Sequence, residues 1–363
     1  MLDIKAEHLL GFFVLIAPLI KNKAIMCIFV NMKNILYLLV LALCACCSYD
    51  NRILVKNSGE AQGSYYHIQY LSEHGENYKS QIDSILFEVD SSLSIYKDYS
   101  LISKLNKREN IKTDTLFNAV FLGAQKVFVE SEGNFDCSVS PLVNAWGFYK
   151  NKLSDSLVID SAKFRKILPY VGFDKISLIA DSLVLPKGMS LDFNSIAQGY
   201  TVDIIAQFLE SKGDSNYLVE VGGELLAKGM NADGNIWRVG VDKPSEDIDE
   251  QERFQFILDL ENKALATSGN YRKFYEQDGV KYAHTINPFT GFTAKNRLLS
   301  VTVIHDNCML ADAYATAFMV MGVKQSKQFA KSHSEIEIYL VYTGNDGAWK
   351  TFVSPNMQNR IIN

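Results

Sequence analysis

The stretch LDFNSIAQGYTVDIIAQFLESKGDSNYLVEVGG, residues 191–223, decides the fold of this chain. Apolar residues recur at helical spacing from Ile204 to Leu209, and Gly213 is the kind of residue that ends a helix. Tyr217–Val221 is a short apolar run typical of a strand, and Gly222-Gly223 predicts a tight turn after it. The stretch therefore predicts a loop, a helix, a strand and a turn in that order.

The loop at the start of this helix is rich in small residues. An aspartate, two small polar residues and a Gly-Tyr pair lead into the apolar run. The first N–H groups of a helix have no partner within the helix, and they favour anions, phosphate above all. We infer that the loop can hold a phosphorylated ligand. The alternative is a strand-loop-helix unit that binds nothing, which is common in α/β proteins.

The composition is that of a folded domain. The chain has 363 residues, of which 48% are hydrophobic, and a formal net charge of -5. That length allows a large hydrophobic core. Because the net charge is negative and provides no basic field, we do not expect nucleic acid as a partner. Strand and helix patterns mix without regular alternation. We therefore predict an α+β fold, built either as one large domain or as two closely packed subdomains.

Periodicity predicts further elements along the chain. Helices are expected at residues 80–93, 116–130, 163–171 and 309–321, and strands at 65–71, 176–186, 237–241, 254–260, 271–275, 281–286, 298–304, 336–342 and 349–353. Residues 244–253 are mostly charged and are interpreted as a solvated insertion.

Residues 1–47 differ from the rest of the chain. Two apolar runs, Leu9–Ile20 and Ile35–Leu43, are each shorter than the roughly 18–20 residues of a membrane-spanning helix. The second run follows Lys33 and has the parts of a secretory signal. It ends in Leu43-Cys44-Ala45-Cys46, which resembles a bacterial lipobox. We therefore expect lipidation of Cys46.

A start at Met32 would place this signal at the N-terminus, and a double-hydrophobic leader from Met1 is the alternative. Residues 48–60 are polar and are expected to form a tether. A lipid on Cys46 would anchor the protein to the membrane in the cell envelope, facing the periplasm. The alternative is that Cys46 is an ordinary cysteine in a cleaved or uncleaved leader.

Two cysteines remain outside the leader, Cys137 and Cys308. The C-x-x-C spacing from Cys44 to Cys47 straddles the expected cleavage site, so no zinc or dithiol site is predicted in the mature chain. Cys137 and Cys308 lie in apolar segments, which fits either buried thiols or a disulfide between them.

The segment ADAYAT, residues 311–316, is the strongest local signal outside residues 191–223. On a helix Asp312 and Thr316 are four residues apart, so they share a face. A carboxylate and a hydroxyl, with a nearby backbone carbonyl, are hard oxygen ligands that Mg²⁺ takes together with a substrate phosphate. The alternative is an aspartate that caps the helix start, with the threonine packed behind it.

Two more segments carry polar groups. Ala266–Arg272, ATSGNYR, is interpreted as a turn that is either a phosphate cradle or a plain loop. His284 begins HTINPFTG, where Asn287-Pro288 and Gly291 predict a turn. A histidine titrates near neutral pH and can take a proton from an attacking hydroxyl, although a lone histidine is more often structural.

These segments together resemble one family. The motifs D-x-x-S-I-A-Q-G-Y-x-V-D from Asp192, V-G-G-E from Val221, A-T-S-G-N-Y-R from Ala266, H-x-I-N-P-x-T-G from His284 and A-D-A-x-A-T from Ala311 are similar to those of the FAD:protein FMN transferases, the ApbE family. The resemblance runs from about residue 60 to the final hairpin. Residues 61–363 are therefore expected to form an ApbE-like flavin transferase domain. The resemblance implies an α+β fold with mixed or antiparallel sheets, packed helices and two closely associated subdomains.

The resemblance implies roles for individual residues. Those that match contacts to the flavin nucleotide are Gln62, Tyr96, Asn134, Phe135, Asp136, Asp192, Gln198 and Ile286. The implied ligands of Mg²⁺ are Asp312, Thr316 and the carbonyl of Ser195, and His284 matches the catalytic base. Gln62, Gln198 and Asn287 depart from the methionine, the lysine or glutamate, and the aspartate that are common in the family at these positions.

The activity implied by the resemblance is Mg²⁺-dependent transfer of FMN from FAD onto a Thr or Ser hydroxyl of an acceptor protein, with release of AMP. The implied acceptor is a flavoprotein subunit of a membrane redox complex. Two alternatives stay open at this point. One is a Mg²⁺-dependent FAD diphosphatase that gives FMN and AMP, and the other is a flavin-binding lipoprotein without catalysis.

Overall fold

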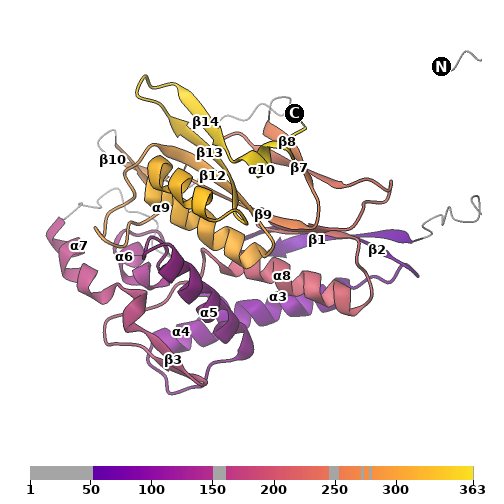
Figure 1. Ribbon diagram of the computed structural model, residues 1–363. Helices are drawn as coiled ribbons and strands as arrows, with labels where there is room; N and C mark the ends of the chain where they lie inside the picture. Colours follow the sequence, from indigo (N-terminus) through magenta and orange to yellow (C-terminus); the bar gives the residue numbers. More distant parts are fainter. Residues whose placement is uncertain (1–51, 150–160, 245–252, 271–273, 278–279, 363) are drawn as a thin grey trace, which may run out of the picture. The chain divides into compact units, whose positions relative to one another are not determined.

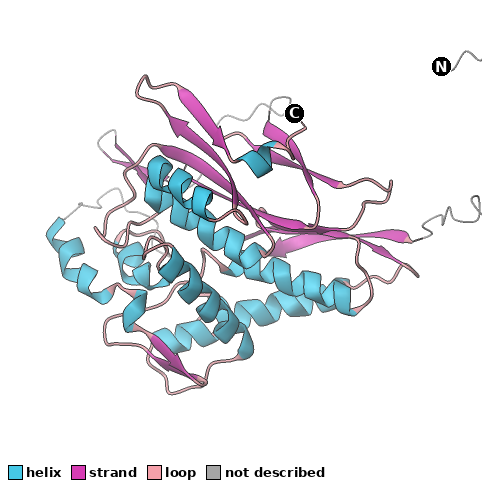
Figure 2. Ribbon diagram, viewed as in Figure 1, coloured by secondary structure: helices cyan, strands magenta, loops and turns pink. Residues whose placement is uncertain are grey.

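The computed structural model describes residues 52–149, 161–244, 253–270, 274–277 and 280–362. An eight-stranded sheet forms its centre, and every neighbouring pair of strands in it is antiparallel (Figure 2). The order across the sheet is β1 (Ile53–Ala61), β2 (Ser64–Ser72), β5 (Tyr217–Val221), β6 (Glu224–Lys228), β9 (Lys263–Gly269), β12 (Leu298–His305), β13 (Glu337–Thr343) and β14 (Trp349–Val353).

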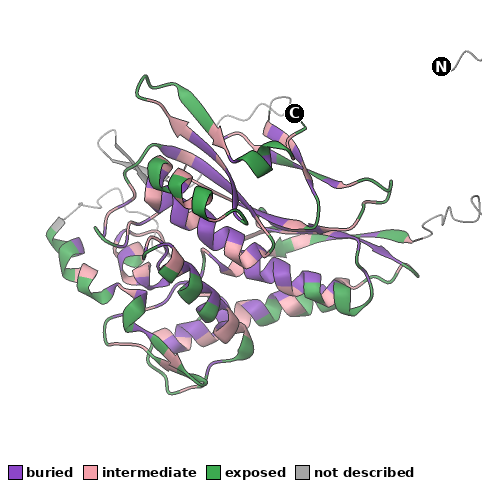
Figure 3. Ribbon diagram, viewed as in Figure 1, coloured by how far each residue is buried: buried purple, intermediate pink, exposed green. Residues whose placement is uncertain are grey.

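Helices cover one face of this sheet (Figure 1). They are α3 (Lys79–Leu93), α5 (Thr115–Glu130), α8 (Ala197–Ser211) and α9 (Cys308–Ser332). Helix α8 packs on β5 and β6, and α9 packs on β9 and β12, while α3 and α5 pack against α8 and α9 in turn. Their inner faces are buried (Figure 3). The alternation of strand side chains supports this layer, since Ala264 and Ala266 of β9 face the helices and Leu265 faces the other side.

The other face of the sheet is covered by a hairpin and a short helix. The hairpin joins β7 (Trp237–Asp242) to β8 (Phe254–Leu260), and the helix is α10 (Pro355–Gln358). Phe256 and Leu258 of the hairpin and Met357 of α10 are buried in one cluster with Leu265. The remaining elements are α4 (Leu101–Asn106), α6 (Ser140–Ala145), α7 (Ser161–Ile167), β3 (Ser177–Ile179), β4 (Ser182–Val184), β10 (Phe274–Gln277) and β11 (Val280–Ala283), with short 3-10 turns at Cys137–Val139, Leu168–Tyr170 and Phe173–Lys175.

The α+β fold with antiparallel sheets is confirmed, and most predicted helices and strands are present. Helix α9 extends beyond the predicted end at Met321. Gly322 has a φ of 75°, which interrupts the helical backbone, and the chain then continues in helical conformation to Ser332. The pattern predicted the part before the break, because a left-handed glycine is a normal stop signal for a helix.

The prediction of a tether over residues 48–60 is wrong from Ile53 onward, because β1 begins there and pairs with β2 along its whole length. Val55 and Asn57 are buried, whereas Lys56 and Ser58 are exposed. A strand at the edge of a sheet carries polar residues on its outer face, so its composition resembles that of a linker. Residues 48–51 lie outside the described part of the chain.

The interpretation of Ala266–Arg272 as a turn is also wrong for its first four residues. Ala266–Gly269 end β9, which lies between β6 and β12 in the middle of the sheet. Small residues occur there because α9 packs directly on this strand. The hydroxyl groups of Thr267 and of Thr302 on β12 form a hydrogen bond at 2.9 Å.

Residues 52–363 form one compact unit, so the two expected subdomains are not separated within it. None of the helices described here is both long enough and apolar enough to cross a bilayer.

Candidate functional site at the crossing of α8 and α9

Helices α8 and α9 touch at Gly199. A Cβ added to Gly199 would lie 2.4 Å from the carbonyl oxygen of Cys308 and 2.9 Å from Cβ of Asp312. No side chain fits into that space, so the glycine permits the close approach of the two helices. We call the group formed by Gly199, Asp203, Cys308 and Asp312 the α8–α9 crossing.

Each helix gives a carboxylate to the N-terminal end of the other at this crossing. Oδ2 of Asp312 accepts a hydrogen bond from the Gly199 N–H at 3.2 Å. One turn further along α8, the Asp203 carboxylate accepts the N–H groups of Cys308 and Met309, both at 2.9 Å. The first N–H groups of a helix have no partner within the helix and carry partial positive charge, so both arrangements are favourable.

Burial raises the pKa of both carboxyl groups. The pKa of Asp312 is raised to about 7 and that of Asp203 to about 6, because the loss of hydration outweighs the hydrogen bonds that each receives. Among the described residues, the Gly199 N–H is the one hydrogen-bond partner of the Asp312 carboxylate. A bound cation would favour the ionised form of Asp312 and so compensate for its burial.

Thr316 follows Asp312 one turn later on α9, and its Oγ1 is 3.3 Å from Oγ of Ser268 at the end of β9. The described residues contain no group of three or more His, Cys, Asp or Glu side chains able to hold a metal ion. The donor set of Asp312, Thr316 and the Ser195 carbonyl nevertheless fits Mg²⁺, which takes oxygen ligands and keeps several waters or substrate phosphate oxygens.

Two turns of the sheet approach the start of α8. Gly222, with a φ of 71°, directly follows β5, and a Cβ there would lie 2.3 Å from Nε2 of Gln198. Gln62, in the turn between β1 and β2, donates from Nε2 to Oγ1 of Thr201 at 2.7 Å. The structure thus brings the predicted flavin contacts Gln62 and Gln198 to the same end of one helix.

Asp192 lies before α8 with both carboxylate oxygens occupied. Oδ1 accepts the N–H of Asn194 at 2.8 Å, and Oδ2 accepts the hydroxyl of Tyr149 at 2.5 Å. Tyr96 accepts a hydrogen bond from the side chain of Asn194 at 3.2 Å, and half of its surface is exposed. Asp192 therefore orients neighbouring groups, while Tyr96 presents its ring to solvent.

The Cys137 thiol is buried. Burial raises its pKa, and the charges of Asp136, Asp192 and Asp312 add to this effect. Ser195 lies two residues before the start of α8.

The side chains of Asn134, Phe135 and Asp136 have structural contacts. Asp136 accepts the N–H and the hydroxyl of Ser138 at 2.7 and 2.6 Å and the N–H of Phe173 at 3.2 Å. Phe135 is buried in the main core, and Asn134 donates to the Ser131 carbonyl. Contact of these three residues with a flavin stays a prediction.

His284 follows β11 and is half-buried. The next residue, Thr285, donates to Oδ1 of Asn270 at 3.0 Å, and Asn270 directly follows β9. Because Ser268 on the same strand contacts Thr316, the segment with His284 is attached to the strand end that borders the metal-ligand candidates.

Hydrogen bonds between residues of the turn itself stabilise the turn after His284. Oδ1 of Asn287 accepts the N–H groups of Phe289 and Thr290 at 2.9 and 3.1 Å, a role that asparagine and aspartate perform equally well. Ile286 is buried with Leu142 and Trp146 in a separate apolar cluster. Its contact with a flavin stays a prediction.

Sequence reasoning assigned no individual role to three residues of this site: Asp203, Tyr149 and Ser268. Asp203 had a signal, because an aspartate within the apolar run TVDIIAQFL is expensive to bury without partners. Ser268 lay in the segment Ala266–Arg272 that was considered as a phosphate cradle, but its contact with Thr316 could not be predicted. Tyr149 had no signal, since its partner Asp192 is distant in the sequence.

The cysteines outside the leader are free and buried, so Cys137 and Cys308 do not form a disulfide. They belong to two different apolar clusters. Cys46 lies outside the described residues.

The fold and the site define a class of protein. It is an α+β protein in which an antiparallel sheet carries two crossing helices, with buried carboxylates at their contact. The family model described as "ApbE family" matches residues 62–340. The chain therefore belongs to the ApbE family.

Relatives agree with this assignment over most of the chain. The FAD:protein FMN transferase of Vibrio cholerae is 35% identical over 312 residues, which are 83% of this chain and 91% of that protein. The FAD:protein FMN transferase of Haemophilus influenzae is 31% identical, covering 84% and 90% of the two chains. The solved structure titled "Flavin Transferase ApbE from Vibrio cholerae" superimposes with a TM-score of 0.77 at 33% identity, covering 85% of this chain and 99% of that one.

Proposed function

We propose that this chain is an enzyme that moves FMN from FAD onto a Thr or Ser hydroxyl of an acceptor protein and releases AMP. The observation that carries the proposal is the convergence of five separated motifs. Gly199 contacts Asp312, Gln198 lies against Gly222, Ser268 contacts Thr316, and Thr285 contacts Asn270. The relatives named as FAD:protein FMN transferases support the same reading.

We further propose that Asp312, Thr316 and the Ser195 carbonyl hold Mg²⁺ when FAD binds. A divalent cation there would neutralise the diphosphate and stabilise the charge that develops on the leaving AMP. Asp312 is suited to this role because it is buried, acidic and fixed by the Gly199 N–H. Tyr96 and Gln198 are proposed to bind and orient the nucleotide beside it.

His284 is proposed to act as the general base. It takes the proton of the acceptor hydroxyl while the hydroxyl oxygen forms a bond to the phosphorus on the FMN side. The bond between that phosphorus and the bridging oxygen breaks, and the bridging oxygen leaves with AMP. The products are AMP and an acceptor protein that carries FMN in a phosphoester bond.

The test is AMP release by a chain that begins at Ser48, given FAD and Mg²⁺, with and without a candidate acceptor subunit. This form keeps the whole compact unit that begins at Arg52. We expect AMP in the presence of acceptor, together with a mass increase of one FMN on the acceptor. AMP and free FMN without any acceptor would instead indicate a diphosphatase, and binding of FAD without AMP would indicate a flavin-binding protein.

We also propose that a lipid on Cys46 anchors the protein to the membrane in the cell envelope, facing the periplasm. The acceptor is then a flavoprotein subunit of a membrane redox complex that exposes its flavin-attachment segment on that side. The support is the lipobox-like sequence that ends at Cys46. Mass spectrometry of the membrane-extracted protein tests it, and an unmodified Cys46 would refute the anchor.

A further inference from the structure

We propose that Asp203 is a positioning residue that holds Asp312 in place for a divalent cation, acting through the N-terminus of α9. The inference rests on the metal site proposed above and adds a residue to it. Asp203 lies on the other helix, has no part in the ligand set, and is buried.

The first step is that α9 depends on Asp203 for its N-terminal hydrogen bonds. The N–H groups of Cys308 and Met309 both donate to the Asp203 carboxylate. The N-cap residue Asn307 accepts the N–H of Leu310 at 2.9 Å and donates from Nδ2 to Oδ2 of Asp203 at 2.7 Å. A carboxylate of α8 thus fixes where α9 begins.

The second step is that this anchor determines the place of Asp312. Cys308 and Asp312 are one turn apart on α9, and Asp203 and Gly199 are one turn apart on α8. The contacts Asp203–Cys308 and Gly199–Asp312 are therefore two successive links between the same helices. Loss of the first link lets α9 shift along α8, and a shift of α9 carries the Asp312 carboxylate away from the Gly199 N–H.

The third step is that only a carboxylate fits the donors that face Asp203. Oδ2 receives two donors, from Asn307 and Met309, and Oδ1 receives a third from Cys308. An amide of the same shape would turn its NH₂ group toward at least one N–H donor. Asp203→Asn is therefore an isosteric change that disturbs the anchor without opening a cavity.

A matched control exists on α5. Asp114 caps that helix by accepting the N–H of Phe117 at 2.7 Å, and it also accepts the hydroxyl of Ser92 at 2.9 Å. Asp114 is exposed, and Asp114→Ala removes the cap of a helix that packs against α9 without changing the crossing. A role of Asp203 in stability alone would make the two variants behave alike.

The experiment titrates Mn²⁺ into the full chain with stoichiometric FAD and no acceptor, and follows the loss of the free Mn²⁺ signal by electron paramagnetic resonance. Thermal unfolding is measured in parallel. We expect Asp203→Asn to weaken Mn²⁺ binding at least about tenfold, and Asp114→Ala to lower the unfolding midpoint while Mn²⁺ affinity stays within about twofold of the wild-type value.

Two results would overturn the inference: wild-type Mn²⁺ affinity in Asp203→Asn, or equal losses of affinity in both variants. If Asp203→Asn does not fold, Asn307→Ala removes one donor to Asp203 together with the N-cap of α9, and it is expected to weaken Mn²⁺ binding about threefold; unchanged affinity would overturn the inference as well. Failure of the wild-type chain to bind Mn²⁺ would instead overturn the metal site itself.

Discussion

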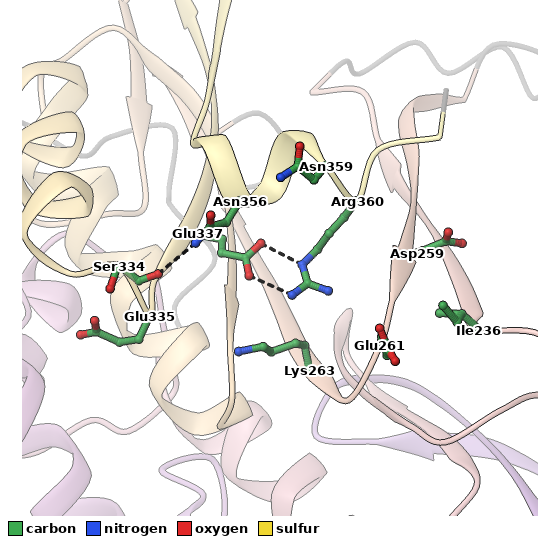
Figure 4. Close-up of a pocket in the computed structure, with 10 residues that line it drawn as sticks. All are labelled: Ile236, Asp259, Glu261, Lys263, Ser334, Glu335, Glu337, Asn356, Asn359 and Arg360. Atoms are coloured by element: carbon green, nitrogen blue, oxygen red, sulfur yellow. Dashed lines mark hydrogen bonds and ion pairs between the residues drawn. The ribbon is translucent and has the colours of Figure 1, made fainter.

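Charged side chains have different kinds of partner at the α8–α9 crossing and in the hollow between β13, α10 and the β7–β8 hairpin. The hollow, lined by residues that include Asp259, Lys263, Glu337 and Arg360, has a volume of about 540 Å³ (Figure 4). There the Arg360 guanidinium donates to both oxygens of Glu337 at 2.9 and 3.0 Å, and Lys263 pairs with Asp306 at 2.6 Å. At the crossing, the partners of Asp203 and Asp312 are backbone and side-chain amides.

The difference shows that the volume of a hollow does not by itself identify the functional site. In the hollow, Glu337 and Lys263 have partners of opposite charge, so the protein satisfies these groups by itself. At the crossing, two buried carboxyl groups have raised pKa values because amides compensate for only part of their lost hydration. A buried acid that the protein has not paired with a cation is the better sign of a functional site.

The largest expected effect on turnover is that of Asp312→Ala. It removes the one carboxylate of the proposed metal site, so we expect AMP release to fall by about 10³-fold or more at saturating FAD. The measurement is initial AMP release over a range of Mg²⁺ concentrations. Turnover at the wild-type rate would show that the crossing is not the metal site.

The next effect is that of His284→Ala. Loss of a general base typically lowers the rate by about 10²–10⁴-fold, and we expect transfer to fall by this factor. FAD affinity, measured by flavin fluorescence, should stay within about twofold because the histidine is proposed to act on the acceptor hydroxyl. A variant that has lost FAD binding would assign a structural role to His284.

A smaller effect is expected from pH. The pKa of Asp312 in the metal-free protein is raised to about 7, and a protonated carboxyl group does not bind a cation. Affinity for Mg²⁺ should therefore decrease as the pH falls below 7, by at most about tenfold per pH unit. Calorimetric titration of Mg²⁺ between pH 5.5 and 8 measures this, and constant affinity over that range would contradict it.

The smallest effect on turnover is expected from Glu337→Gln in the hollow. It leaves the Arg360 guanidinium without its carboxylate, so we expect the free energy of unfolding to fall by about 2–4 kcal/mol, since the pair is largely buried. AMP release per folded molecule should stay within about twofold of wild type. Denaturant unfolding and the AMP assay test both parts, and a large loss of turnover would remove the contrast between the two regions.

The sequence by itself determined the fold class and most of the helices and strands. Periodicity is a local property, so the pattern of residues 191–223 predicted α8 and β5. Periodicity did not predict segments whose composition is atypical of the secondary structure that they form. The polar edge strand β1 resembled a tether, and the small residues at the end of β9 resembled a turn, because each depends on a neighbour that is remote in the sequence.

The candidate site was predicted in part. Asp312 and Thr316 share a helix face by their spacing alone, and the ordered motifs indicated the family. Only the tertiary structure decided that Asp203 caps α9 from another helix, that Tyr149 donates to Asp192, and that Cys137 and Cys308 stay apart. The physical reason is that helix periodicity fixes neighbours within one element, whereas the contact between α8 and α9 depends on how closely Gly199 lets two distant segments pack.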